Sequence, residues 1–237
     1  RPWERDVYEA LAEVLAGCIP VPDACAPGTQ NGGRYEFDSA IDVYEHLQTD
    51  ARWVNESDNP IFQRKKIWLL PQKMDPDLDR DLPVEQKLLV ERYGETIIDP
   101  YTGTEKPNPW WVANRNNPDA LDTVRQFVEG SLAQVAIGLM QDAQRDQDPA
   151  KYRMAAAKFR EYMDKFPIAD NFFQNQWYLA NALLNADPKD SQRPWGSYEE
   201  ALKEFTSLVQ TRDNHPYGDG ALFGIMTARK SIIEAKG

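Results

Sequence analysis

One stretch of the sequence limits the possible folds more than any other. Apolar residues between Leu121 and Leu139 recur at steps of three and four, at Leu121, Val124, Val128, Leu132, Val135 and Leu139. This spacing places their side chains on one face of an α-helix. Asn117-Pro118-Asp119 comes just before and is a typical helix start, because Asn caps free N–H groups and Pro suits the first turn. We therefore expect a long helix over residues 118–145.

More helices are expected in the second half of the chain. They are predicted from Asp148-Pro149 through Phe166-Pro167, and over residues 171–185, 198–210 and 218–235. Short helices in succession favour antiparallel hairpins stacked side by side. The sequence therefore predicts an all-α fold with stacked helical hairpins in its C-terminal half.

The first half of the chain is less regular. It holds 12 of the 17 prolines, and residues 1–120 carry 22 acidic and 13 basic side chains, against 16 and 14 in the remainder. Helices are predicted over residues 3–17, 38–48 and 83–93, a buried strand or extended segment at Ile67–Leu70, and loops over residues 18–37 and 95–117. We expect two regions: residues 1–117, acidic, Pro-rich, loop-rich and mostly helical, and residues 118–237, a helical repeat region.

Small and aromatic residues recur at matching positions in the second region. The first copy is Ala155-x3-Phe159 with Tyr162 and a closing Pro167, and the second is Ala201-x3-Phe205 with Leu208. Together with Trp177–Leu183, these residues resemble the tetratricopeptide repeat (TPR) family, in which a small residue lets two helices approach and an aromatic residue fills the next layer. The resemblance implies stacked hairpins that bind other proteins.

The two copies are not regularly spaced. Ala155 and Ala201 lie 46 residues apart, whereas TPR units repeat about every 34 residues. The enlarged loop 186–197 accounts for the excess, and Phe223-Gly224 would begin a third unit. We therefore expect a departure from a regular TPR superhelix.

A narrower resemblance concerns location. The closing Phe166-Pro167 is similar to envelope members of the family, such as outer-membrane assembly lipoproteins and periplasmic cell-division coordinators. It implies an exported, periplasmic protein of the bacterial cell envelope. Cys18 and Cys25 either form a disulfide, which would require an oxidising compartment, or remain two free thiols.

Charge and hydropathy argue against several classes of partner. The net charge is −11, which disfavours binding to nucleic acid or to an anionic lipid surface. No apolar run reaches the roughly 18 residues of a transmembrane helix. Other proteins of a larger complex are the expected partners.

The sequence lacks the common catalytic motifs. It contains no Gly-x-Ser-x-Gly, His-Glu-x-x-His or phosphate-binding loop. His46 is expected to be an ordinary histidine on a helix. Alternating carboxylates at Asp75, Asp77, Asp79 and Asp81 are arranged as in a calcium loop, but Arg80 stands where such a loop needs Gly. We expect a solvated acidic loop there, with no catalytic residue, metal or cofactor.

Two groups of residues are candidates for partner binding. Gln174, Asn175 and Asn181 lie on the first helix of the clearer unit, where the TPR family presents polar side chains to ligands. Trp110, Trp111 and Trp195 are expected in loops, where tryptophan either anchors an interface or packs in a core.

The sequence thus favours a non-catalytic scaffold or adaptor in a multiprotein assembly. The alternative is a carbohydrate-binding module or a hydrolase with its site in the Trp-rich loops of the first half. A pocket lined by Trp110, Trp111 and carboxylates of raised pKa would favour that alternative.

Overall fold

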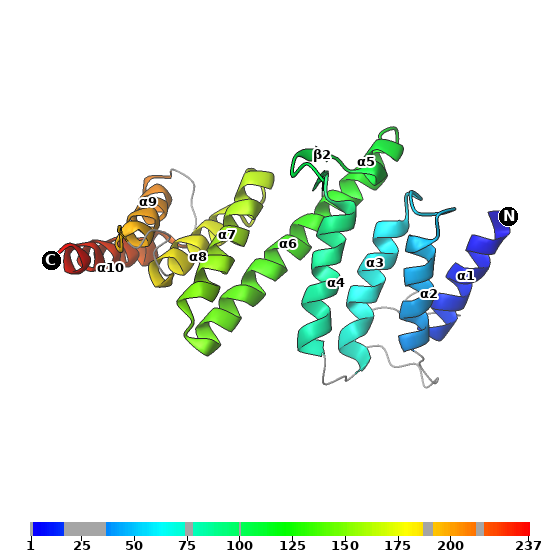
Figure 1. The fold of residues 1–237 in the computed structure, drawn as a ribbon, viewed down its shortest axis with the longest axis horizontal. Helices are drawn as coiled ribbons and strands as arrows, with labels where there is room; N and C mark the ends of the chain where they lie inside the picture. Colours follow the sequence, from blue (N-terminus) through cyan, green and yellow to red (C-terminus); the bar gives the residue numbers. More distant parts are fainter. Residues whose placement is uncertain (1, 17–36, 74–77, 100, 187–191, 212–215) are drawn as a thin grey trace. The chain divides into compact units, whose positions relative to one another are not determined.

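The computed structural model describes residues 2–16, 37–73, 78–99, 101–186, 192–211 and 216–237, and these are mostly helical (Figure 1). The predicted all-α class is confirmed. In chain order the helices are α1 Pro2–Leu15, α2 Phe37–Thr49, α3 Asn59–Leu69, a short 3-10 helix Leu70–Lys73, α4 Leu78–Tyr93, α5 Pro109–Ala113, α6 Pro118–Asp146, α7 Pro149–Lys165, α8 Phe172–Asn185, α9 Gly196–Gln210 and α10 Gly218–Lys236. A hairpin of β1 Thr96–Ile98 and β2 Glu105–Pro107 precedes α5, with Ile97 opposite Lys106.

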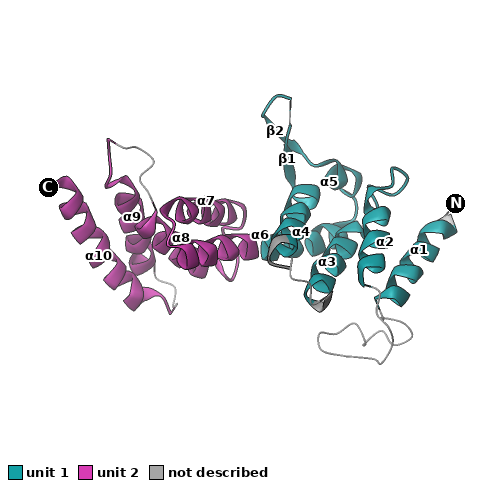
Figure 2. Cartoon of the chain, turned by 60° about the horizontal axis from the view of Figure 1, so that its bottom comes forward, with its two compact units in different colours: residues 1–131 teal, residues 132–237 magenta. Residues whose placement is uncertain are grey.

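The chain divides into two compact units, residues 1–131 (unit 1) and 132–237 (unit 2), as coloured in Figure 2. The division falls inside α6, between Ser131 and Leu132, and not at residue 117, where the composition changes. A long helix can contribute its first turns to one core and its later turns to another.

In unit 1, α1 to α4 stand side by side, each packed on its neighbour in the sequence (Figure 1). Tyr44 and Leu47 of α2 and Phe62 and Leu69 of α3 are almost completely buried. The Tyr44 and Phe62 rings stack with their centroids 5.5 Å apart. These side chains form the apolar core that joins α1, α2 and α3.

In unit 2, the later turns of α6 share an apolar cluster with α7 and α8, and α7 to α10 then pack in sequence order. The helix starts follow from local chemistry. Asn117 accepts a hydrogen bond from the backbone N–H of Ala120 at 3.2 Å, and Asp148 accepts one from Ala150 at 2.9 Å. Both residues satisfy N–H groups that a first helical turn leaves unpaired, and Pro118 and Pro149 follow them.

Three expectations for the first half were wrong. Ile67–Leu70 lies in α3 and the 3-10 helix, and is neither a strand nor an extended segment. Pro83 lies inside α4, which begins at Leu78 and not at Pro83. Residues 95–117 are not all loop, because they contain the hairpin and α5.

Candidate functional site

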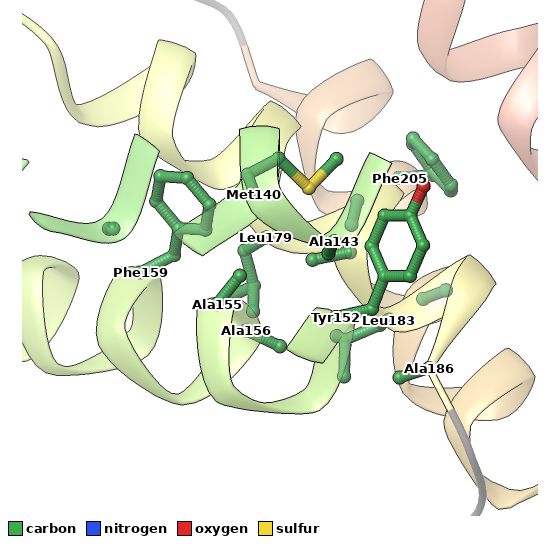
Figure 3. Close-up of a cluster of buried hydrophobic side chains, with 14 of the residues drawn as sticks. Met140, Ala143, Tyr152, Ala155, Ala156, Phe159, Leu179, Leu183, Ala186 and Phe205 are labelled. Atoms are coloured by element: carbon green, nitrogen blue, oxygen red, sulfur yellow. The ribbon is translucent and has the colours of Figure 1, made fainter. Parts of the chain in front are cut away.

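The interior of unit 2 sets small side chains against aromatic rings (Figure 3). Ala155 and Phe159 of α7, and Ala201 and Phe205 of α9, are completely buried in one cluster. Ala180 of α8 belongs to the same cluster. Alanines allow the helix axes to come close, and the rings fill the space between layers. Both copies of the sequence pattern therefore lie in the buried cluster of unit 2.

Helix α10 approaches its neighbours through two glycines. A Cβ atom added to Gly224 would lie 2.6 Å from the Phe205 ring, and one added to Gly220 would lie 2.6 Å from Cη2 of Trp177. No larger residue fits either position without a shift of the ring. Gly224, in the residue pair Phe223-Gly224 that was expected to begin a third unit, thus lies directly against an aromatic ring.

One face of α8 is polar and reaches the surface. Gln174, Tyr178, Asn181 and Asn185 are spaced four, three and four residues apart, and each is half-buried or exposed. Asn181 donates to the carbonyl of Trp177 and Asn185 to that of Asn181, both at 2.8 Å. Gln174 Nε2 lies 3.4 Å from the Tyr178 hydroxyl. These four residues form the α8 polar stripe, which contains two of the three polar residues proposed from sequence.

The third, Asn175, lies elsewhere. Its side chain is buried, and its Nδ2 donates to the carbonyl of Asn171 at 2.8 Å. Its Oδ1 has no hydrogen-bond partner among the described residues. Asn175 is therefore part of the interior of unit 2 and does not belong to the stripe.

Trp195 is half-buried just before α9. Lys236 places its Nζ 5.1 Å from the centre of the Trp195 ring and donates to Glu199 at 3.1 Å. That hydrogen bond, joined by one from Arg193, lowers the pKa of Glu199. These contacts attach the segment before α9 to the last turn of α10.

Trp110 and Trp111 lie in α5, and both are buried in unit 1. Trp110 Nε1 donates to the carbonyl of Glu56 at 2.8 Å, and Trp111 Nε1 donates to that of Tyr93 at 2.7 Å. The Arg125 guanidinium lies 5.0 Å from the Trp111 ring. Both indoles thus have the packing role, with their N–H groups satisfied inside the unit.

A cleft of about 390 Å³ lies beside Trp110 in unit 1. Its lining includes Trp110 together with Gln48, Asn55, Arg92 and Tyr93, but not Trp111. The Trp110 residue is only 3% exposed. A sugar needs an open ring face on which to stack, and with so little of its surface exposed Trp110 offers almost none.

Unit 1 contains a network of ion pairs between its helices. Lys66 of α3 is 2% exposed and pairs with Glu45 of α2 and with Glu85 of α4, the latter at 2.9 Å. Arg92 of α4 holds the other oxygen of Glu45 at 2.7 Å. Burial opposes ionisation of Glu45, but hydrogen bonds from Arg92 and Lys66 outweigh it and lower its pKa to about 2. Sequence patterns did not reveal this network, because its members are far apart in the chain.

The remaining candidates from the sequence, a histidine, a calcium loop and a disulfide, do not form a site among the described residues. The histidine His46 is exposed on α2, as expected, with its ring against Tyr8 at 4.9 Å. Among the described residues, no three metal-binding side chains come together. The disulfide expectation involves Cys18 and Cys25, which lie outside the described residues. The calcium expectation involves Asp75 and Asp77, which also lie outside them, as does the side chain of Asp79. Asp81 is half-buried in α4.

Two helices expose apolar faces. On α1 the exposed residues are Trp3, Val7, Leu11 and Val14, and on α10 they are Leu222, Phe223, Met226 and Ile233. Single exposed apolar residues are common on protein surfaces, but a row of them along one helix marks a surface that can bind another protein.

Comparisons with protein-family models and with curated proteins found no match to this sequence. Within the described residues, no helix combines the length and the apolar character needed to cross a membrane.

Proposed function

We propose that the protein is a non-catalytic scaffold that binds other proteins through TPR-like helical hairpins. The observation that carries the proposal is the recurrence in unit 2 of a buried small residue followed four positions later by a buried aromatic residue, at Ala155 and Phe159 and at Ala201 and Phe205, together with the close approach of Gly224 to the Phe205 ring. Repeated packing of this kind sets helices in a row. A partner segment can then contact several helix faces at once.

The α8 polar stripe is the proposed contact surface. Asn181 and Asn185 are each held by a hydrogen bond to a carbonyl one turn earlier in their own helix. Side chains that are already fixed lose little conformational entropy when a partner binds. The stripe therefore offers polar groups in defined positions, which favours specific recognition of a peptide or helix.

We further propose that the scaffold is a subunit of a larger assembly in the bacterial cell envelope. The support is the resemblance at Phe166-Pro167, where Phe166 ends α7 and packs on Tyr162 at 5.4 Å. Fractionation of the native source should recover the protein in the periplasmic or envelope fraction. Recovery in the cytosolic fraction would overturn this part of the proposal.

A site-specific photo-crosslinker tests the contact surface in the intact chain. We expect a crosslinking residue at Asn181 to capture a defined protein from the native source, identified by mass spectrometry. The matched control carries the crosslinker at Lys203, an exposed residue of α9 outside the stripe. Capture of the same proteins at both positions, or of none at Asn181, would count against the α8 polar stripe as the binding surface.

A further inference from the structure

The β1–β2 hairpin projects from unit 1 (Figure 2) and leaves backbone groups of β1 unpaired. The carbonyl of Glu95 accepts a backbone hydrogen bond across the hairpin at 3.0 Å, and the N–H of Asp99 donates one at 2.8 Å. In an antiparallel pair every second residue bonds to the neighbouring strand, so Thr96 and Ile98 point their N–H and C=O groups away from β2. Within the described residues, these groups of Thr96 and Ile98 have no backbone hydrogen-bond partner.

The two edges of the hairpin differ. On β2 the residues that point outward are Glu105 and Pro107, because they lie opposite Ile98 and Thr96. Pro107 has no N–H to donate, and a proline on an edge strand opposes pairing with a further strand. The edge of β1 has no such residue, and Ile98 is 64% exposed. The hairpin can therefore accept a third strand beside β1 but not equally well beside β2.

The open edge of β1 borders the cleft that lies beside Trp110. Ile97 pairs with Lys106, and alternate residues share a face, so Ile97 and Asn108 lie on the same face of the hairpin. Both residues line the cleft of about 390 Å³, together with apolar groups of Val54 and Pro109. On a strand paired with β1, the side chain opposite Ile97 would lie on this face and beside the cleft. An aliphatic side chain suits this position.

The charges around this edge favour a basic segment. The cations of the cleft and the hairpin already have carboxylate partners, at 2.7, 2.8 and 3.4 Å in the pairs Arg92–Glu45, Lys106–Asp99 and Lys87–Glu91. Glu95 is exposed and forms no ion pair with another described residue. It shares a face with Ile97, two residues later in the chain. A lysine or arginine opposite Glu95 would therefore meet a carboxylate that has no cation of its own.

We propose that the edge of β1 binds an extended basic segment of a partner protein, which adds an antiparallel third strand to the hairpin. Thr96 and Ile98 supply the main-chain hydrogen bonds. An aliphatic residue of the segment enters the cleft beside Ile97, and a basic residue two positions later faces Glu95. The segment thus carries an aliphatic-x-basic sequence. This site in unit 1 goes beyond the α8 polar stripe of the proposed scaffold and uses a different mode of recognition.

A labelled peptide, Thr-Thr-Leu-Thr-Lys-Thr-Thr, provides the probe. It carries the aliphatic-x-basic sequence, and threonine favours an extended backbone. Fluorescence anisotropy with the intact chain should give a Kd on the order of 100 μM. NMR of the same complex should show slower hydrogen exchange at the amides of Thr96 and Ile98, because the added strand pairs with them. Absence of binding up to about 1 mM peptide, or binding without protection of these two amides, would overturn the proposal.

Proline substitutions locate the edge. Ile98→Pro removes an outward N–H from β1 and should weaken binding of the peptide by at least about tenfold. Glu105→Pro is the matched control, because it removes the outward N–H of the residue opposite Ile98 on β2. This control should leave the affinity unchanged. Equal losses in both variants, or no loss in Ile98→Pro, would show that the peptide does not pair with β1.

A charge exchange tests the register and needs neither proline variant. Glu95→Lys should weaken binding of the lysine peptide by at least about fivefold. A peptide with glutamate in place of lysine should bind Glu95→Lys more tightly than it binds the unsubstituted chain. Glu95 is exposed, so the substitution should leave unit 1 folded. If Glu95→Lys and the unsubstituted chain bind both peptides equally, the proposed pairing is wrong.

Sedimentation velocity separates a partner strand from a second copy of this chain. The proposal expects no dimer at the concentrations used for binding. A dimer that dissociates on Ile98→Pro would assign the edge to self-association and so contradict the proposal. Failure here is distinguishable from failure of the scaffold function, because specific crosslinking at Asn181 does not depend on the hairpin.

Discussion

The two units fill the spaces between their helices with different chemistry. In unit 1 the buried residues include Arg5, Gln48, Gln63 and Lys66, and ion pairs run from α2 through α3 to α4. In unit 2 the buried apolar cluster consists mostly of alanine and aromatic residues. The side-by-side packing of helices thus combines an apolar core with directional polar contacts in unit 1, whereas in unit 2 it depends mainly on complementary shape.

This difference determines which substitutions and conditions destabilise each unit. A buried ion pair depends on both partners and on pH, because one charge left alone inside a protein is costly. An apolar interface is insensitive to pH but depends on volume, since a lost ring leaves a cavity and an added atom has no space. Substitutions can therefore test the stability of each unit on its own.

The largest expected effect is in the apolar interior of unit 2. Phe159→Ala should lower the free energy of unfolding by about 3–5 kcal/mol, because the Phe159 ring is completely buried. Hydrogen exchange measured peptide by peptide in the intact chain should show the loss of protection in α7 and α8. Ile168→Ala, at a residue 95% exposed, is the control and should change little. Equal effects of the two substitutions would contradict the role assigned to the ring.

The next effect is in the ion-pair network of unit 1. Lys66→Ala should destabilise unit 1 by about 3 kcal/mol, because it removes the cation that Glu45 and Glu85 share inside the helix interface. Chemical denaturation combined with hydrogen exchange of α2 to α4 measures this loss of stability. Lys87→Ala breaks an exposed pair with Glu91 and should cost less than about 0.5 kcal/mol. A loss at Lys66 no greater than at Lys87 would show that the network contributes little.

A smaller effect is expected from adding one methyl group to unit 2. Gly224→Ala should cost about 1–3 kcal/mol, because the new Cβ would meet the Phe205 ring at 2.6 Å. Gly218→Ala is the matched control in the same helix, since nothing lies within 4 Å of a Cβ there. The two thermal unfolding curves should differ in midpoint. A neutral Gly224→Ala variant would mean that Phe205 moves aside freely and that the contact is not a close one.

The smallest effect is the response of unit 1 to acid. The folded state lowers the pKa of Glu45 from 4.5 to about 2, so the ionised carboxylate stabilises unit 1 fully above about pH 4.5. This stabilisation is lost as the pH falls toward 2. Because Glu45 is partly exposed, we expect a contribution on the order of 1 kcal/mol. Glu45→Gln should reduce the decline in unit 1 stability between these pH values, and an unchanged decline would exclude Glu45 as its source.

The same contrast explains which parts of the fold could be predicted from the sequence. In unit 2 most buried positions are apolar, so their spacing revealed α6 to α10, and the predicted helices match the observed ones closely. In α3 the buried residues include Asn59, Gln63 and Lys66. These polar residues interrupt the apolar periodicity, and the short run Ile67–Leu70 then resembled a strand. The helix became recognisable only once long-range partners for its polar residues were known.

The residues of the candidate binding surfaces could also be predicted from the sequence only in part. Gln174 and Asn181 share a helix face with Tyr178 and Asn185, as helical spacing requires. Asn175 is adjacent to Gln174 in the chain but turns into the interior, a distinction that needs the exact orientation of α8. The burial of Trp110 and Trp111 depends on carbonyls of Glu56 and Tyr93, which no local pattern could indicate.

The order in which the helices pack has a consequence for how the chain folds during its synthesis. In both units most helices contact the next one along the sequence, from α1 through α4 and from α7 through α10. Such contacts close only short loops, and folds of this kind form rapidly. Each helix can therefore pack on its predecessor soon after it leaves the ribosome, so the apolar surface of one helix is covered before much more of the chain has been synthesised.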